Sequence, residues 1–185
     1  MTALTDIHQT AMEADPSGKA GMFVIDRNVL QKLLIALNEC TEWGRIAILN
    51  SLARYKSADE EEAEHICERV MPQFQHANGS VVLGAVKVIL IHMQKVRKEE
   101  FVMQLIRKMA PPLVTLISSA PEIQWVALRN VNLILQRHPE LLQNELRIFF
   151  CKYNDPSYVK LEKLEIMIKL ANKRNVDMLL SELKE

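Results

Sequence analysis

Residues 81–93 read VVLGAVKVILIHM, and this stretch decides what kind of fold the chain forms. Its apolar residues recur at the i, i+3, i+4, i+7 and i+8 spacing of a single stripe, made of Val82, Ala85, Val86, Ile89, Leu90 and then Met93. This spacing is typical of an amphipathic α-helix that buries one face. Asn78 and Ser80 are the candidate N-caps of a helix over about 80–95.

The same pattern continues almost without a break on both sides of this stretch. The chain holds five glycines and only 5% aromatic residues, whereas a large sheet needs glycine at its turns and aromatic or β-branched pairs. The sequence therefore predicts an all-α fold. Helices are expected over 27–39 behind Asp26, after Thr41, after Ser57 or Asp59, over 99–119 with an interruption at Pro111–Pro112, over 122–137, 140–151 and 157–173, and from Asn175 onward.

The first residues differ from the rest. Leu4, Ile7 and Ala11 fall at helical spacing and predict a helix over 1–14. Residues 14–21, ADPSGKAG, contain a proline and two glycines, so 15–25 is expected to form a mobile surface loop. Residues 26–185 are then expected to form stacked helix pairs.

The expected helix pairs resemble one another. VVLGAVKVI at 81–89 aligns with IQWVALRNV at 123–131, which places Ala85 and Ala127 42 residues apart. ERVMPQF at 68–74 aligns with RKMAPPL at 107–113, which places Pro72 and Pro112 40 residues apart and predicts a bend in the first helix of each pair. This period predicts a HEAT/armadillo-like α-α superhelical solenoid of about five helix pairs. A closed bundle or globin-like fold would need neither the period nor the recurrent proline.

Bulk composition excludes several classes of protein. The 185 residues carry 23 basic and 23 acidic side chains, so there is no net basic surface of the kind that binds nucleic acid. Apolar runs are short, such as VILI at 88–91, and fall below the roughly 20 residues that a membrane span needs. The three cysteines are widely spaced and odd in number, so we expect Cys40, Cys67 and Cys151 to be reduced and buried.

No pattern of residues predicts chemistry, so no catalytic, cofactor-binding or metal-binding residue is assigned. The five histidines show no i, i+4 pair, and GxSxG, GxxxxGK and GxGxxG are all missing. Glu60–Glu62 are expected to be a solvated start of a helix, where the helix dipole favours acids. Asn50, Asn130, Asn132, Trp43 and Trp125 do not recur at one phase, which argues against the asparagine–tryptophan ladder of nuclear-import scaffolds.

Three further patterns are interpreted as structural. Residues 158–161, YVKL, fit a tyrosine sorting signal but open a helix in which Leu161 and Leu164 are expected to be buried. Residues 141–145, LLQNE, approach a clathrin box but have Asn144 where an apolar residue is required. The basic residues in two clusters are expected to line solvated surfaces: Lys95, Arg97 and Lys98 in a loop, then Lys160, Lys163, Lys169, Lys173 and Arg174 along one helix.

Four stretches, at 32–55, 63–88, 109–142 and 149–172, closely resemble the trunk of the beta-adaptins, the beta large subunits of the clathrin-associated adaptor complexes. The most specific strings are LNECTEWG at 37–44, APPLVTL at 110–116, VALRN at 126–130 and KYNDPSYVKLEKL at 152–164. The resemblance covers about 28–185 and points to the middle part of the trunk. Residues 1–185 are thus interpreted as one fragment of a longer adaptin trunk solenoid.

The resemblance implies a non-enzymatic scaffold in vesicle-mediated protein transport. The implied partners are the medium chain, whose N-terminal domain the trunk cradles, the second large chain and the small chain. The segments that carry small-GTPase and phosphoinositide contacts, the clathrin box and the appendage lie outside this sequence. Clathrin binding is therefore expected only through segments absent from this sequence. Peripheral membrane association, at coated pits, Golgi or endosomes, is expected only through the whole complex. The implied location is cytoplasmic, and the plasma-membrane and Golgi/endosomal types are not distinguished.

Two other classes of protein remain as alternatives. One is another HEAT-type binding module, such as a coatomer large subunit or a nuclear transport receptor, which should show a phased ladder or a patch of one charge. The other is an enzyme of unrecognised type, which would show turnover that depends on one buried polar residue. For the scaffold, we expect the second helix of each pair to line the inner curve. Apolar faces exposed at both ends should make the isolated chain self-associate or be only moderately stable.

Overall fold

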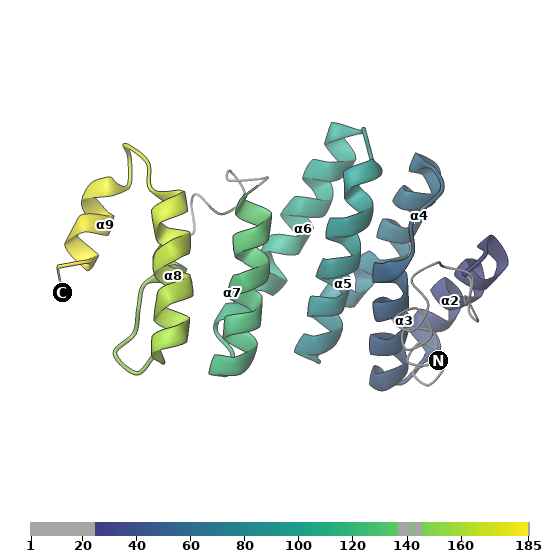
Figure 1. Ribbon diagram of the computed structural model, residues 1–185, viewed down its shortest axis with the longest axis horizontal. Coiled ribbons are helices and arrows are strands. Elements are labelled where there is room, and N and C mark those ends of the chain that lie inside the picture. Colours follow the sequence, from purple (N-terminus) through teal and green to yellow (C-terminus); the bar gives the residue numbers. More distant parts are fainter. Residues whose placement is uncertain (1–24, 137–141, 143–145, 185) are drawn as a thin grey trace, which may run out of the picture. The chain divides into compact units, whose positions relative to one another are not determined.

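A computed structural model describes residues 25–136, 142 and 146–184 of the chain. Within these residues all regular structure is α-helix or 3-10 helix, and no strand occurs, so the prediction of an all-α fold is confirmed. The chain divides into two compact units, residues 1–102 (unit 1) and 103–185 (unit 2). Figure 1 labels their helices and colours the chain by residue number. The helix predicted over 1–14 and the loop predicted over 15–25, apart from Ile25, lie outside the described residues.

Unit 1 contains α2 (Arg27–Glu39), α3 (Glu42–Arg54), α4 (Glu60–Val70) with the 3-10 turn η1 (Met71–Gln75), and α5 (Gly79–His92) with η2 (Met93–Lys95). Three of the predicted caps are confirmed because their side chains accept backbone hydrogen bonds: Asp26 from Val29 N, Asp59 from Glu62 N and Asn78 from Ser80 N. Thr41 occupies the predicted N-cap position of α3, but its hydroxyl makes no capping hydrogen bond.

Helices one repeat apart run parallel in unit 1. The start of α2 reaches the start of α4 through Arg27 and Glu62, and the end of α2 reaches η1 through Asn38 and Gln73, both with a separation of 35 residues. The second helices of the pairs, α3 and α5, also lie side by side (Figure 1). Each pair therefore packs on an equivalent pair, which is the stacking that a helical repeat requires.

A glycine sets the closest approach between α3 and α5. A Cβ atom added at Gly84 would lie 3.2 Å from Leu49 Cδ1 and 3.3 Å from Leu49 Cβ. A side chain at this position would push Leu49 aside, so Gly84 allows the two parallel helices to pack closely here.

His92, at the end of α5, is buried in unit 1. It is 1% exposed, and its Nε2 hydrogen-bonds the Leu52 carbonyl oxygen at 3.0 Å. Burial lowers the pKa of the imidazole, the Leu52 hydrogen bond and Glu62 partly oppose this, and Lys95 lowers it further. The Tyr55 ring lies 6.4 Å away.

Acid should therefore destabilise unit 1 through His92. The folded-state pKa lies below that of the unfolded chain, so below about pH 6.5 the unfolded state binds a proton that the folded state resists. We expect the free energy of unfolding to fall by up to about 1.4 kcal/mol per pH unit from this group. Urea denaturation at pH 7, 6 and 5 measures it. The His92→Gln variant, which keeps a donor for Leu52, should lose that slope, and an unchanged slope in the variant would contradict the assignment.

Helix α6 (Glu99–Ile117) contains the division between the units and continues through Pro111 and Pro112, so the predicted interruption is wrong. Each proline removes one hydrogen bond within the helix, which frees the carbonyl groups of Arg107 and Lys108 four residues earlier. Both of these residues are exposed, so water can satisfy their carbonyl groups. Pro72 acts differently, since α4 ends at Val70 and the proline lies in η1.

Unit 2 continues with α7 (Pro121–Leu135), α8 (Ser157–Leu170) and α9 (Val176–Glu182). Pro121 opens α7, and Asn175 precedes α9, as predicted. Five of the twelve residues of the helix predicted over 140–151 lie outside the described residues, and among the rest 146–149 forms a 3-10 turn, so no α-helix is seen in the described part. That the chain is one fragment of a longer solenoid stays a prediction.

Candidate interaction surface

Helices α7 and α8 share an edge built from interacting side chains. The Trp125 and Tyr158 rings meet edge to face with centroids 6.4 Å apart. The Arg129 guanidinium lies 5.5 Å over the Trp125 ring and 3.2 Å from Glu162 Oε1. An aromatic pair and a cation over an indole each add about 1 kcal/mol to simple burial. This edge therefore holds the two helices in one register.

The second half of the edge is polar. Lys169 Nζ donates to Asn132 Oδ1 and lies 3.0 Å from Glu165 Oε1. Hydrogen bonds from Asn132 and then Lys169 lower the pKa of the Glu165 carboxyl, which is therefore ionised at neutral pH. Because partners follow one another in the same order along both helices, α7 and α8 are parallel, and Figure 1 shows them side by side.

Exposed apolar side chains flank this edge. They are Val126 and Leu133 on α7, at 38% and 59% exposure, and Leu161 and Ile168 on α8, at 67% and 69%. We call these four residues, with Trp125, Arg129 and Tyr158, the α7–α8 face. Leu161 and Leu164 were predicted to be buried, but Leu161 is exposed and Leu164 is half-buried, because α8 turns Val159, Ile166 and Met167 inward instead.

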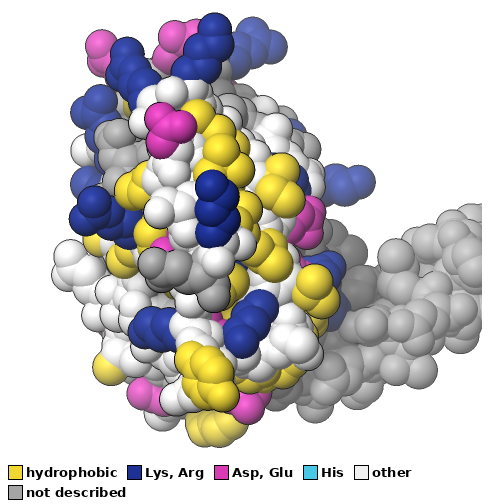
Figure 2. All heavy atoms as spheres, turned by 90° about the vertical axis from the view of Figure 1, so that its left-hand side faces the viewer, with side chains coloured by type: hydrophobic (Ala, Val, Ile, Leu, Met, Phe, Trp, Pro, Cys, Tyr) yellow, Lys and Arg dark blue, Asp and Glu magenta, His cyan; other side chains and the backbone are white. Residues whose placement is uncertain are grey.

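The C-terminal end of unit 2 also exposes apolar surface. Val176, Leu180 and Leu183 on α9 are 37%, 49% and 50% exposed. Viewed from that end, hydrophobic side chains gather with lysines and arginines between them (Figure 2). Apolar patches with a polar rim are typical of protein-contact surfaces.

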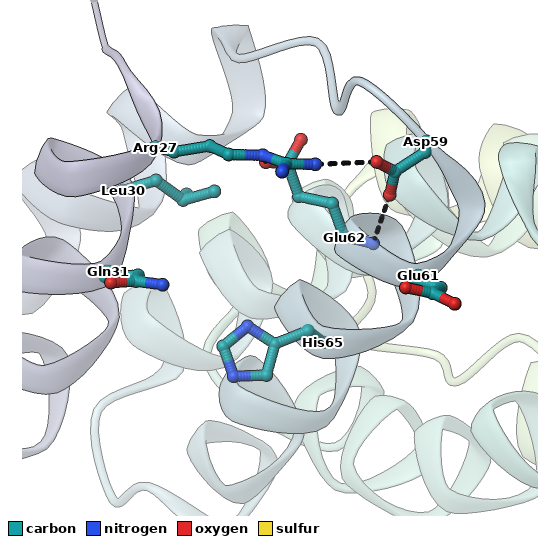
Figure 3. Close-up of a pocket in the computed structure, with 7 residues that line it drawn as sticks. All are labelled: Arg27, Leu30, Gln31, Asp59, Glu61, Glu62 and His65. Carbon is teal, nitrogen blue, oxygen red and sulfur yellow. Dashed lines mark hydrogen bonds and ion pairs between the residues drawn. The ribbon is translucent and has the colours of Figure 1, made fainter.

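Unit 1 contains a shallow pocket of about 230 Å³, shown in Figure 3. It lies between α2 and α4 and is lined by Arg27, Leu30, Gln31, Asp59, Glu61, Glu62 and His65. Arg27 crosses it, with an ion pair of 2.7 Å to Asp59 and one of 3.4 Å to Glu62. No nucleophile paired with a base lies in it, and its charged groups are used to join the two helices.

Glu62 corrects the prediction of a solvated acidic helix start. It is 8% exposed, and its Oε2 accepts hydrogen bonds from Tyr55 Oη at 2.9 Å and from Ala58 N at 2.6 Å. Burial, followed by the hydrogen bond to Glu62, raises the pKa of the Tyr55 hydroxyl, which stays protonated and donates. Glu62 therefore anchors the segment between α3 and α4.

Most members of the two basic clusters are exposed, as predicted, namely Lys95, Arg97, Lys98, Lys169, Lys173 and Arg174. Lys163 is the buried exception. Lys98 pairs with Glu64 at 2.7 Å, and Lys163 is 1% exposed and pairs with Asp155 at 2.6 Å. Lys173 and Arg174 lie beyond the end of α8.

Of the three cysteines that were predicted to be buried, only Cys67 is. Its burial raises the pKa of the thiol to about 12, whereas Cys40 and Cys151 are only half-buried.

Among the described residues, no group of three or more His, Cys, Asp and Glu side chains is placed to hold a metal ion. In the same part of the chain, no helix is both long enough and apolar enough to cross a bilayer. The LLQNE segment, apart from Leu142, lies outside this part.

The α7–α8 face was missed at the level of sequence because each helix alone gives no reason to single it out. The available signal is the spacing of 33 residues that separates Trp125 from Tyr158 and Arg129 from Glu162. Once parallel packing is known, that spacing places an aromatic pair beside an ion pair. Glu162 Oε2 is buried there without a partner, so Arg129 satisfies only one of the two carboxylate oxygens.

Comparison with known proteins gives the family. Residues 20–185 match the family model described as the adaptin N-terminal region. The AP-1 complex subunit beta of Dictyostelium discoideum is 56% identical over 173 residues, which cover 94% of this chain and 18% of that protein. The AP-1 complex subunit beta-1 of Saccharomyces cerevisiae is 41% identical over 186 residues, with coverages of 99% and 25%. The AP-2 complex subunit beta of Schizosaccharomyces pombe is 41% identical over 160 residues, with coverages of 86% and 24%.

This chain thus spans about a fifth to a quarter of the length of these relatives. The family match, together with the parallel stacked helices of each unit, confirms the predicted class of HEAT/armadillo-like solenoid. The chain therefore belongs to the adaptin family, as part of the N-terminal trunk region of a beta-adaptin.

Proposed function

We propose that this chain is part of the beta large subunit of a clathrin adaptor complex, in which it serves as a non-enzymatic scaffold for vesicle-mediated protein transport. The observation that carries the proposal is the 41–56% identity, over most of the chain, to proteins named as beta subunits of AP-1 and AP-2 complexes. These relatives favour an adaptor over a coatomer subunit or a nuclear transport receptor. Since both AP-1 and AP-2 subunits are among them, the proposal covers either type.

The proposed partners are the other adaptor subunits: the medium chain in particular, the second large chain and the small chain. The α7–α8 face supports this proposal, because exposed leucine and isoleucine side chains around an aromatic pair are suited to a protein partner. Clathrin binding is assigned to segments outside this sequence. Membrane association is assigned to the whole complex, on the cytoplasmic side of coated pits, Golgi or endosomes. We further propose that the second helices of the pairs, α3, α5, α7 and α8, line the inner curve.

Co-expression of this chain with the N-terminal domain of an adaptor medium chain tests the proposal. We expect a stoichiometric complex in affinity pull-down and sizing. The double variant Leu161→Asp and Ile168→Asp should weaken it at least tenfold, because two charges would be buried at the interface without partners. The proposal would be contradicted if the medium chain domain were not captured in the pull-down although circular dichroism shows that this chain is helical.

The matched control is Ile35→Asp, which places a charge at an isoleucine that is 55% exposed on α2 in unit 1. It should leave the complex intact. An equal loss of binding from this control would show that the α7–α8 face is not the contact, even if the subunit assignment holds.

A further inference from the structure

Tyr153 lies in the loop of residues 150–156 before α8, which we call the Tyr153 loop (Figure 1). Tyr153 is 97% exposed, the highest value among the large hydrophobic residues of the described chain. Tyrosine usually buries its ring and keeps only the hydroxyl in contact with water. A single exposed apolar residue is unremarkable by itself, so the construction of the loop around it decides whether it has a role.

Hydrogen bonds hold the backbone of the loop at four residues, namely Phe150, Lys152, Tyr153 and Asp155. Lys152 N donates to Asp155 Oδ2 at 2.9 Å, and Asp155 N donates back to the Lys152 carbonyl at 3.0 Å. Lys160 Nζ donates to the carbonyl oxygen of Tyr153 itself at 3.1 Å. Lys163 Nζ reaches both Asp155 and the Phe150 carbonyl, at 2.6 and 3.3 Å. Tyr153 is therefore presented from a rigid backbone.

The ion pair between Lys163 and Asp155 is not an efficient way to stabilise this loop. The Lys163 and Asp155 side chains are 1% and 10% exposed, and two charges lose most of their hydration when they are buried in this way. An apolar pair of similar size would often be as stable or more stable. The ion pair instead specifies one loop conformation, because its donors and acceptors hold Phe150, Lys152 and Asp155 in one arrangement.

The loop also has a definite charge. Lys152 is exposed and Lys160 is half-buried, while Lys163 neutralises the one acidic residue, Asp155. The unneutralised charges that Lys152 and Lys160 place beside Tyr153 are therefore positive. A partner that fits it needs a pocket for an aromatic ring and carboxylates at the rim of that pocket.

We propose that the Tyr153 loop is a preorganised docking element that inserts the Tyr153 ring into an acid-rimmed pocket on another subunit of the same adaptor complex. This inference rests on the proposed function. An ordered tyrosine loses little entropy on binding, which is why such residues often dominate interfaces. A protein pocket is favoured over a lipid surface, because two lysines give only about 2 kcal/mol at an anionic membrane, and a lipid surface does not require a rigid loop.

The test is a titration of this chain with each purified adaptor subunit in turn: medium chain, second large chain and small chain. We expect Tyr153→Ala to raise the dissociation constant for one of them at least tenfold, with Tyr153→Phe within about threefold of the unchanged chain. Lys152→Glu should slow association with the same subunit and flatten its salt dependence. Trp43→Ala removes another exposed ring, 82% exposed in unit 1, and should change nothing.

The outcomes separate the two proposals. If the unchanged chain binds no subunit, the proposed function fails and this inference fails with it. If it binds a subunit and Tyr153→Ala binds equally well, only the inference is overturned. Sedimentation with phosphatidylserine–phosphatidylcholine vesicles is run in parallel, and loss of vesicle binding in Tyr153→Ala with intact subunit binding would overturn the protein pocket in favour of a membrane.

Discussion

Replacing Glu62 with alanine is expected to lower the free energy of unfolding of unit 1 by about 2–3 kcal/mol. The carboxylate accepts hydrogen bonds from Tyr55, Ala58 and Arg27, and it is 8% exposed. Hydrogen bonds to a buried charged group are worth more than neutral ones. Arg27 contributes little to this figure because its side chain is 69% exposed and can be hydrated again. Urea denaturation followed by circular dichroism measures the loss.

The control for Glu62 is its neighbour Glu61, which is exposed on the same turn of α4. Glu61→Ala should change the free energy of unfolding by no more than about 0.5 kcal/mol. Equal effects of the two substitutions would mean that net charge at the start of α4, and not the buried hydrogen bonds, stabilises this region.

Replacing Lys163 with methionine should have the larger effect, a loss of about 3–4 kcal/mol from unit 2. Methionine fills the space but leaves Asp155 with a charge that is 10% exposed and without its cation. The double variant Lys163→Met and Asp155→Asn should recover most of the loss, because asparagine still accepts from Lys152 N without carrying a charge. Thermal and urea denaturation of both variants test this, with the exposed Lys173→Met as a control that should be neutral.

The same ion pair predicts an acid limit for unit 2. Burial alone would raise the pKa of Asp155, but hydrogen bonds from Lys163 and from Lys152 N outweigh it and the pKa is lowered. The unfolded chain has the higher pKa, about 3.9, so this contribution is complete above that pH and is lost as the pH falls through the folded-state value. The Lys163→Met single variant should be destabilised already at pH 7. This result separates the loss of the cation from the protonation of Asp155, which occurs only in acid.

The parts of the fold that were predicted from sequence are those set by local chemistry. Asp26, Asp59 and Asn78 could be identified as caps because a short acceptor side chain bonds the backbone two or three residues ahead. The stripe of α5 could be identified from its period alone. The repeat was visible because Ala85 and Ala127 occupy equivalent places in successive pairs.

The parts that were missed depend on residues about one repeat away. Glu62 looks like a solvated acid because its sequence neighbours do not show that Tyr55, Ala58 and, from 35 positions earlier, Arg27 converge on its carboxylate. Leu161 looks like a core residue because its own helix gives no sign of which side α7 covers. Pro111 and Pro112 suggest an interruption, but their exposed neighbours let water replace the lost bonds. The candidate interface was missed for the same reason, since Trp125 and Tyr158 become a pair only through packing.

The parallel packing of helices one repeat apart, which is seen within each unit, has a consequence for how that unit folds and unfolds. Among the described residues, the longest sequence separation bridged by a side-chain hydrogen bond is 40 residues, between His92 and Leu52. In this part of the chain each helix pair therefore forms side-chain hydrogen bonds only with the adjacent pair, and most such contacts close a loop of about 30–40 residues. Folding can begin at any pair and propagate to the adjacent pairs. Conversely, damage at one pair should loosen its neighbours while pairs further along the chain stay folded.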